Sequence, residues 1–247
     1  MIELSQLLGQ AWKAHGTVAI PAGLDPADSD AAYLAQAGLL QAIGDEAGGW
    51  KLGARSADGP IQGAPLPSRG IHANGANLKC ADFAVLGLEL EIAFSFTRGF
   101  SPADAALSDA QILACLQSMR TSSEIVSSRV AGWPHIPQLV QLADLQNHGA
   151  LVVGAPIAYD GNFPFVAPAV RFSIAGKTLF EGQGTNPAGD PRRLLPWVVR
   201  HCIARNLALP AGSVLTTGTY VGAHFSQGAG VVTGEIEGLP SLQFTLA

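Results

Sequence analysis

Two glutamates in the stretch LELEIAFSF, residues 88–96, are the first candidates for chemistry. Glu89 and Glu91 alternate with apolar residues at the even positions, and no lysine or arginine lies beside them. This period is typical of a strand with one buried face, so both carboxylates are expected to project from the opposite face. Their Cα atoms would then lie roughly 6.5–7 Å apart. The pair indicates either an ordinary solvated strand face or two ligands of a cation, because neighbouring like charges repel.

Two further residues extend this candidate site. Glu124 lies in the polar stretch TSSEIVSSR, and three carboxylates from two segments could hold one hard cation such as magnesium, which prefers oxygen ligands. The alternative for Glu124 is a surface ion pair with Arg129. Lys51 stands in the apolar stretch WKLG, which favours a partly buried lysine suited to proton transfer. The alternative is a lysine at a strand end whose charged group reaches water.

A third group of candidates lies in the C-terminal half of the chain. The stretch LTTGTYVG places Thr217 and Thr219 on either side of a glycine. Hydroxyls and backbone amides on such a turn can hold a carboxylate, although the same residues could form only a strand edge. His148 and His224 are possible acid–base groups, but lone histidines are more often structural. No dinucleotide, Walker A or nucleophile-elbow motif is present.

Composition limits the class of protein. Of the 247 residues, 48% are hydrophobic and only 13% are charged, which predicts a sizeable core and some surface buried by self-association. The net charge of −5 with no basic run argues against nucleic-acid binding. No apolar run reaches the roughly 18 residues of a membrane-spanning helix. The first residues resemble an amphipathic helix and lack signal-peptide features. The three cysteines form no metal or disulfide pattern, so a cytoplasmic location is expected.

The helices and strands that position these residues can be predicted from hydrophobic periodicity and from capping and turn residues. The first fifty residues look helical, with a second helix expected from about Pro26 to Glu46. A Gly- and Pro-rich segment, residues 56–70, reads as a surface loop or a lid. Strands dominate after about residue 85. The interruptions are a helix starting near Ser108 through ILACLQSM, hairpin turns at 175–176 and 238–240, and a last helix opened by Asp190 and Pro191.

The layout therefore predicts an α+β protein rather than a regular alternation of strands and helices. We expect a small helical N-terminal region, residues 1–55, followed by a strand-rich catalytic core, residues 56–247.

Together these pieces resemble the hydratase/decarboxylase branch of the fumarylacetoacetate hydrolase superfamily, over nearly the whole chain. The motifs that carry the resemblance are AAYLAQ (31–36), GWKLG (49–53), LELEIAFSF (88–96), SSEIVSSR (122–129), ADLQNHGALVVG (143–154), EGQGTNPAGDP (181–191) and LTTGTYVG (215–222). The resemblance implies a fumarylacetoacetase C-terminal-like mixed β core. It also implies a site that binds Mg²⁺ or Mn²⁺. The residues it assigns are the metal ligands Glu89, Glu91 and Glu124 and the catalytic Lys51. We also expect four residues to bind substrate: Arg129, Asp144, Thr217 and Thr219.

The expected activity is a metal-dependent hydratase of aromatic catabolism, which adds water to a 2-hydroxy-2,4-dienoate to give a 4-hydroxy-2-oxo acid. The alternatives are decarboxylation of a 2-oxo-3-enedioate, as by 4-oxalocrotonate decarboxylase, and carbon–carbon hydrolysis of an acylpyruvate. The hydrolysis would need a His-Glu dyad near the N-terminal loop that the sequence does not reveal. Two non-enzymatic alternatives are a metal-binding partner subunit of such an enzyme and a generic domain with surface glutamates. A homo-oligomer is expected, with possible association with a related pathway enzyme.

The chain also departs from the family pattern at three places. Many relatives have an acidic residue in the loop where this chain has LPSRG (66–70), and an aspartate where it has Ser127. The usual Asp-Asn pair is here Asp144-Leu145. These changes leave the three glutamates in place but remove polar groups that would orient substrate or relay protons.

Overall fold

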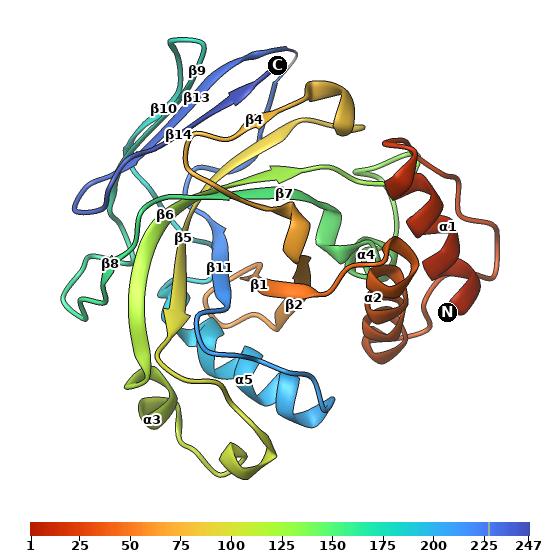
Figure 1. Cartoon of the computed structure of the whole chain (residues 1–247), viewed down its shortest axis with the longest axis horizontal. Helices are drawn as coiled ribbons and strands as arrows, with labels where there is room; N and C mark the ends of the chain where they lie inside the picture. The colour runs from red at the N-terminus through yellow and green to blue at the C-terminus, as the bar shows by residue number, and fades with distance from the viewer. Residues whose placement is uncertain (227) are drawn as a thin grey trace.

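The computed structural model describes residues 1–226 and 228–247, which form two β-sheets with helices around them (Figure 1). Within this part of the chain the larger sheet runs in the order β2-β1-β11-β5-β6-β7-β3, with β12 beside β5 and β8 beside β6. Its strands are β1 (Ala47–Ala54), β2 (Ile61–Pro67), β3 (Ile71–Ala73), β5 (Gly87–Phe96), β6 (Leu116–Val126), β7 (His148–Val153), β8 (Ile157–Ala158), β11 (Val214–Thr219) and β12 (His224–Phe225).

The smaller sheet has the order β10-β9-β13-β14-β4 and packs against one face of the larger sheet. Its strands are β4 (Asn77–Leu78), β9 (Ala169–Ile174), β10 (Lys177–Gln183), β13 (Gly230–Ile236) and β14 (Leu242–Leu246). The even-numbered residues of β5, which the sequence predicted to be buried, join the core that also contains Phe172 and Phe244 of this sheet. The two sheets approach closely at Gly234 of β13, where a Cβ atom would lie 2.4 Å from Leu90 Cδ1 of β5. A side chain larger than that of glycine would not fit there without a shift of Leu90.

Helices lie outside the two sheets. They are α1 (Ile2–Lys13), α2 (Ser29–Ile43), α3 (Asp109–Leu113), α4 (Gln138–Ala143) and α5 (Leu194–Ala204), with short 3-10 turns at Ser68–Gly70, Cys80–Asp82, Pro102–Asp104, Leu145–Asn147 and Pro191–Arg193. A second hydrophobic core lies under α1, α2 and α4, at the right of Figure 1. No helix in the described part of the chain is long and apolar enough to cross a membrane. The predicted α+β fold is confirmed.

Several local predictions are confirmed. Ser108 and Gln111 form a reciprocal capping box at the start of α3. The hairpin of β9 and β10 turns at Ala175 and Gly176, both with positive φ. The side chain of Asp190 caps the turn that leads into α5. These signals are local hydrogen-bonding and steric preferences, so they survive in the tertiary structure.

Other predictions are wrong, two of them because strand pairing overrides the local pattern. The helix after Ser108 ends at Leu113, because the chain from Leu116 onward pairs with β5 as strand β6. Residues 61–67, expected in a loop, form β2 against β1. The second helix spans Ser29–Ile43 and is shorter than predicted.

The alternative of an ordinary solvated face on β5 is also wrong. Glu91, Ala93 and Ser95 on that face are at most 2% exposed. The larger sheet curls, so that Lys51 of β1 reaches Glu124 of β6 although β11 and β5 lie between these strands in the sheet. The odd-numbered face of β5 therefore lines the inside of a curved sheet.

The pairing of β1 with β11 gives a test of this fold. A Cβ atom at Gly49 would lie 2.2 Å from the backbone oxygen of Val214, whereas one at Gly53, in the same strand, would meet nothing within 4 Å. We expect Gly49→Ala to lower the free energy of unfolding by about 1–3 kcal/mol, because the backbones must move apart. Gly53→Ala should change it by less than about 0.5 kcal/mol. Urea unfolding of both variants checks this, and equal effects would contradict the close approach.

Candidate metal centre

The three glutamates singled out by sequence meet inside the curved sheet. Glu89 and Glu91 come from β5, and Glu124 comes from β6, directly opposite Glu89 in the antiparallel register. Carboxylate oxygens from the three residues all lie within 4.8 Å of one another. Glu91 and Glu124 are buried and Glu89 is partly buried. Three carboxylates in this space form a set of oxygen donors suited to a hard divalent cation.

The raised pKa values in this cluster indicate that its negative charges lack a compensating cation. Burial, followed by the repulsion of Glu124, raises the pKa of Glu89 to about 7. Burial, followed by the charges of Glu124 and Glu89, raises the pKa of Glu91 well above its usual range. Like charges in a low-dielectric interior are costly unless a cation compensates them. The cluster therefore suits a cation better than it suits three protein carboxylates alone.

The hydrogen-bond partners of Glu124 all lie at one of its two carboxylate oxygens. Its Oε1 atom accepts hydrogen bonds from Lys51 Nζ at 2.5 Å and lies 2.9 Å from His148 Nδ1. Burial raises the pKa of Glu124, but the lysine charge and the histidine hydrogen bond outweigh it, so the pKa is lowered and the group is anionic. Its Oε2 atom is buried and has no hydrogen-bond partner among the described residues. Such an orphaned anionic oxygen is the feature that a bound cation would satisfy.

Lys51 is fixed between two acceptors. Besides Glu124, its Nζ atom donates to the backbone oxygen of Gln146 at 3.0 Å, and its side chain is only 12% exposed. The charged end of Lys51 therefore lies in the site and not in bulk water. This excludes the alternative of a lysine reaching out from a strand end.

Glu91 is held by Thr216, which the sequence analysis missed, and by the backbone of Gly218, the glycine of the predicted turn. The Thr216 hydroxyl and the Gly218 backbone N–H, the latter at 3.0 Å, both donate to Glu91 Oε2. The predicted Thr217 instead donates to the backbone oxygen of Ile92. Strand parity explains the miss, since neighbouring residues in β11 point to opposite faces.

The other predicted residues have partners away from the carboxylates. Thr219 donates to the backbone oxygen of Gly222 at 3.1 Å. The ring of His224 lies 3.0 Å from the backbone oxygen of Val221, which favours the structural alternative for this histidine. His148, by contrast, is fully buried against Glu124. Nothing in its sequence context distinguished these two histidines.

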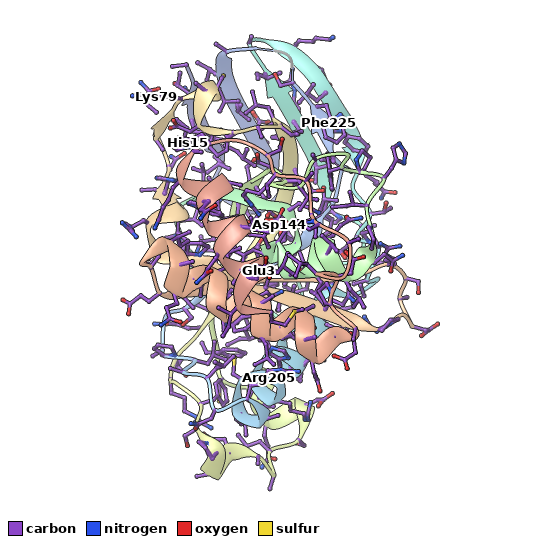
Figure 2. All side chains as sticks on the ribbon, turned by 90° about the vertical axis from the view of Figure 1, so that its right-hand side faces the viewer. Glu3, His15, Lys79, Asp144, Arg205 and Phe225 are labelled. Atoms are coloured by element: carbon purple, nitrogen blue, oxygen red, sulfur yellow. The ribbon has the colours of Figure 1, made fainter. Side chains whose placement is uncertain are left out.

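Arg129 and Asp144 pair with each other. Arg129 Nε donates to Asp144 Oδ1 at 2.6 Å, and both side chains are buried; Asp144 lies in the middle of the molecule in the view of Figure 2. The proposed pair between Glu124 and Arg129 is therefore wrong. Arg129 Nη1 also donates to the backbone oxygen of His148. The ion pair thus fixes the segment that presents His148 to Glu124.

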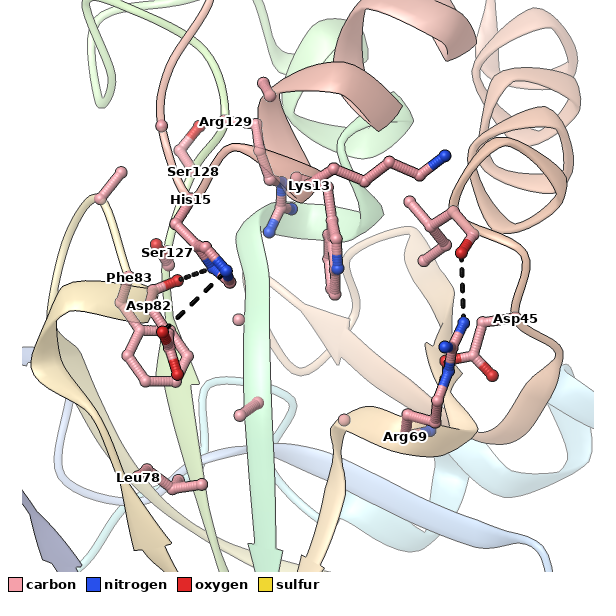
Figure 3. Close-up of a pocket in the computed structure, with 18 of the residues that line it drawn as sticks. Lys13, His15, Asp45, Arg69, Leu78, Asp82, Phe83, Ser127, Ser128 and Arg129 are labelled. Carbon is pink, nitrogen blue, oxygen red and sulfur yellow. Dashed lines mark hydrogen bonds and ion pairs between the residues drawn. The ribbon is translucent and has the colours of Figure 1, made fainter.

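Two of the three places where the chain departs from the family pattern lie beside this centre. A cavity of about 360 Å³ is lined by Arg69 and Gly70 of the LPSRG segment and by Ser127 (Figure 3). Arg69 pairs with Asp45 at 3.2 Å in the wall of this cavity. A Cβ atom on Gly70 would lie 3.6 Å from His148 Nε2. The cavity therefore approaches the glutamate cluster through His148, although neither Lys51 nor the three glutamates line it.

No protein-family model matches the chain. Among curated proteins, it is 25% identical over 156 residues to a 2-keto-4-pentenoate hydratase from Paraburkholderia phymatum. The match covers 63% of this chain and 58% of that relative, which is less than two thirds of the relative's length.

Solved structures extend the similarity to the whole chain. A 4-oxalocrotonate decarboxylase from Pseudomonas putida G7, complexed with magnesium and adipate, aligns with a TM-score of 0.85 at 16% identity. The alignment covers 100% of this chain and 97% of the decarboxylase. A fumarylacetoacetate hydrolase from Exiguobacterium antarcticum aligns with a TM-score of 0.61 at 18% identity, covering 82% and 75% of the two chains. The fold is that of the fumarylacetoacetate hydrolase superfamily.

These comparisons confirm the resemblance to the hydratase and decarboxylase branch of this superfamily. The named neighbours with this fold are enzymes with several different activities. The fold alone therefore does not assign an activity to this chain.

Proposed function

We propose that the protein is a divalent-metal-dependent hydratase that adds water to a 2-hydroxy-2,4-dienoate, giving a 4-hydroxy-2-oxo acid. The observation that carries the proposal is the cluster of Glu89, Glu91 and Glu124 beside Lys51, in which Glu124 Oε2 is buried without a partner. The three glutamates would hold Mg²⁺ or Mn²⁺. The relative named as a 2-keto-4-pentenoate hydratase supports this choice of reaction.

When bound, the metal ion would stabilise negative charge at the substrate carboxylate and C2 oxygen. Lys51 holds a proton at Nζ and is kept in place by Glu124 and the backbone of Gln146. In 2-hydroxypenta-2,4-dienoate, the 2-hydroxyl loses its proton and C5 gains one, which gives a 2-oxo-3-enoate. Lys51 is the group that moves this proton. Water then adds, with its oxygen at C4 and a hydrogen at C3.

His148 and the ion pair behind it would set the position of Glu124. The His148 ring lies against Glu124 Oε1, and Arg129 and Asp144 hold the backbone of the same segment. With Oε1 occupied on two sides, the carboxylate has little freedom to rotate, and Oε2 remains available to a cation.

Decarboxylation of a 2-oxo-3-enedioate is the second candidate. The full-length similarity to a 4-oxalocrotonate decarboxylase, with a TM-score of 0.85, favours it. Loss of carbon dioxide from C5 would leave electrons that the 2-oxo group accepts, and Lys51 could return a proton to C5. Both reactions therefore use the same residues.

A paired ultraviolet assay separates the two reactions. Purified protein is given 2-hydroxypenta-2,4-dienoate in one cuvette and 2-oxohex-3-enedioate in the other, first with Mg²⁺ or Mn²⁺ and then with a chelator. Metal-dependent loss of the dienoate with formation of a 4-hydroxy-2-oxo acid supports the hydratase. Consumption of the enedioate with release of carbon dioxide makes the protein a decarboxylase. No turnover of either substrate, with metal binding intact, would contradict both.

The raised pKa of Glu89 predicts a pH dependence for metal binding. A cation binds the carboxylate and not the carboxylic acid, so its affinity must rise with pH through about 7, the pKa of Glu89. We expect the apparent Kd for Mg²⁺ to be at least about tenfold weaker at pH 6 than at pH 8, because the ion must displace the Glu89 proton, with a pKa near 7, and the raised pKa of Glu91 adds to this effect. Calorimetric titration at the two pH values measures this. Equal affinities would show that Glu89 does not ligate the ion.

A further inference from the structure

A second polar site lies farther along the same face of the β5–β6 pair. Glu124, Ser122, Arg120 and Ser118 alternate along β6, so their side chains share a face. Arg120 is four residues from Glu124, roughly 13 Å away at about 3.3 Å per residue. Between them, Ser122 and its hydrogen-bond partner Thr216 are completely buried. Packed side chains therefore separate Arg120 from the glutamate cluster.

Arg120 is partly buried and lacks the partners that an arginine in such a place requires. The ion pairs formed by arginines in the described part of the chain involve other residues. Its Nη2 donates to Ser118 Oγ at 3.1 Å, while its Nε is buried with no hydrogen-bond partner there. Burial lowers the pKa of the guanidinium, yet arginine stays charged in proteins. A partly buried cation with an unused donor and no counter-ion indicates a missing anion.

The surroundings of Arg120 form a cavity of about 430 Å³. Its polar wall contains the hydroxyls of Ser95 and Ser118, whose oxygens are 2.7 Å apart. The apolar part of its lining consists of Pro156, Ile157 and Ala158, at and just before the start of β8, which pairs with β6. The cavity thus joins one positive charge and two hydroxyls to an apolar surface.

We propose that this cavity binds the carboxylate of a small organic acid with a short apolar chain. The guanidinium of Arg120 can donate two parallel hydrogen bonds to a carboxylate, and the serine hydroxyl that does not donate to the other serine adds a neutral donor. A single arginine balances one negative charge, so a monocarboxylate fits better than a phosphate dianion. The apolar wall would cover the carbon chain of the acid. This site is distinct from the proposed catalytic centre and does not depend on its metal ion.

Hexanoate is a suitable probe for this site. We expect calorimetric titration to detect hexanoate binding to the wild-type protein both with Mg²⁺ and after chelation, because Arg120 does not need the metal. Arg120→Gln should weaken this binding by at least about tenfold, the loss expected for a charged hydrogen bond. Arg171→Gln is the matched control, because Arg171 is an exposed arginine on β9. It should bind as the wild type does.

Three results would overturn the proposal: no hexanoate binding to the chelated protein, equal affinity in Arg120→Gln, or tighter binding of inorganic phosphate than of hexanoate. If Arg120→Gln does not fold, Ala158→Leu provides a second variant, since Ala158 is exposed at the cavity wall and leucine would fill the space. That variant should also weaken hexanoate binding. Turnover is not measured, so a failure of the proposed hydratase activity leaves this test unaffected.

Discussion

Replacing Glu124 by glutamine should reduce the affinity of the protein for Mg²⁺ by about 100-fold or more. The glutamine keeps the shape of the side chain, and its amide oxygen can still accept from Lys51. It cannot supply the anionic Oε2, which is buried and has no partner among the described residues. Loss of a charged ligand from a set of three removes a large part of the attraction for a divalent cation. Calorimetric titration with Mg²⁺, or electron paramagnetic resonance with Mn²⁺, measures the change.

The effect of this substitution on stability should be much smaller than its effect on metal affinity. Lys51 loses its counter-charge, but the repulsion that raises the pKa of Glu89 and Glu91 is relieved at the same time. Glu235→Gln makes the same chemical change at an exposed position of β13 and serves as the control. If Glu124→Gln and Glu235→Gln bind Mg²⁺ equally well, the glutamate cluster is not a metal site.

The sequence predicted the residues of the cluster better than their surroundings. The alternation around Glu89 and Glu91 depends only on local strand geometry, and β5 has the expected register of buried even positions. Whether the other face meets water depends on the curl of the sheet, which brings Lys51 to Glu124. That curl results from pairings between strands far apart in the sequence, and a local period carries no information about it.

The same distinction explains why Thr216 was missed and why His148 could not be told apart from His224. Thr216 could have been preferred to Thr217 had the direction of side chains in β11 been known, since only one of two neighbours in a strand can face Glu91. His148 had no such signal, because its contact with Glu124 spans 24 residues and two strands. The helix predicted after Ser108 failed similarly, because pairing with β5 overrides local helix preference from Leu116 onward.

Lys51 is the residue whose replacement should affect turnover without affecting metal affinity. Lys51→Ala should lower kcat by about 10³-fold, within the 10²–10⁴ range of a positioned acid–base group. Affinity for Mg²⁺ should fall little or not at all, because removing a positive charge beside three carboxylates does not weaken their attraction for a cation. The separation of these two readouts distinguishes proton transfer from metal binding. It is measured by steady-state kinetics on the dienoate and by titration with Mg²⁺.

Chemical rescue tests whether the amine itself is responsible. Truncation of Lys51 leaves space beside Glu124 Oε1 and the backbone oxygen of Gln146, the two acceptors that now hold Nζ. A small primary amine such as ethylamine should occupy this space as the ammonium ion and restore part of kcat in Lys51→Ala. It should have no effect on Lys177→Ala, a matched truncation at an exposed lysine of β10. If Lys51→Ala retains kcat within threefold of wild type, the lysine serves only as the counter-ion of Glu124, and another group must move the proton.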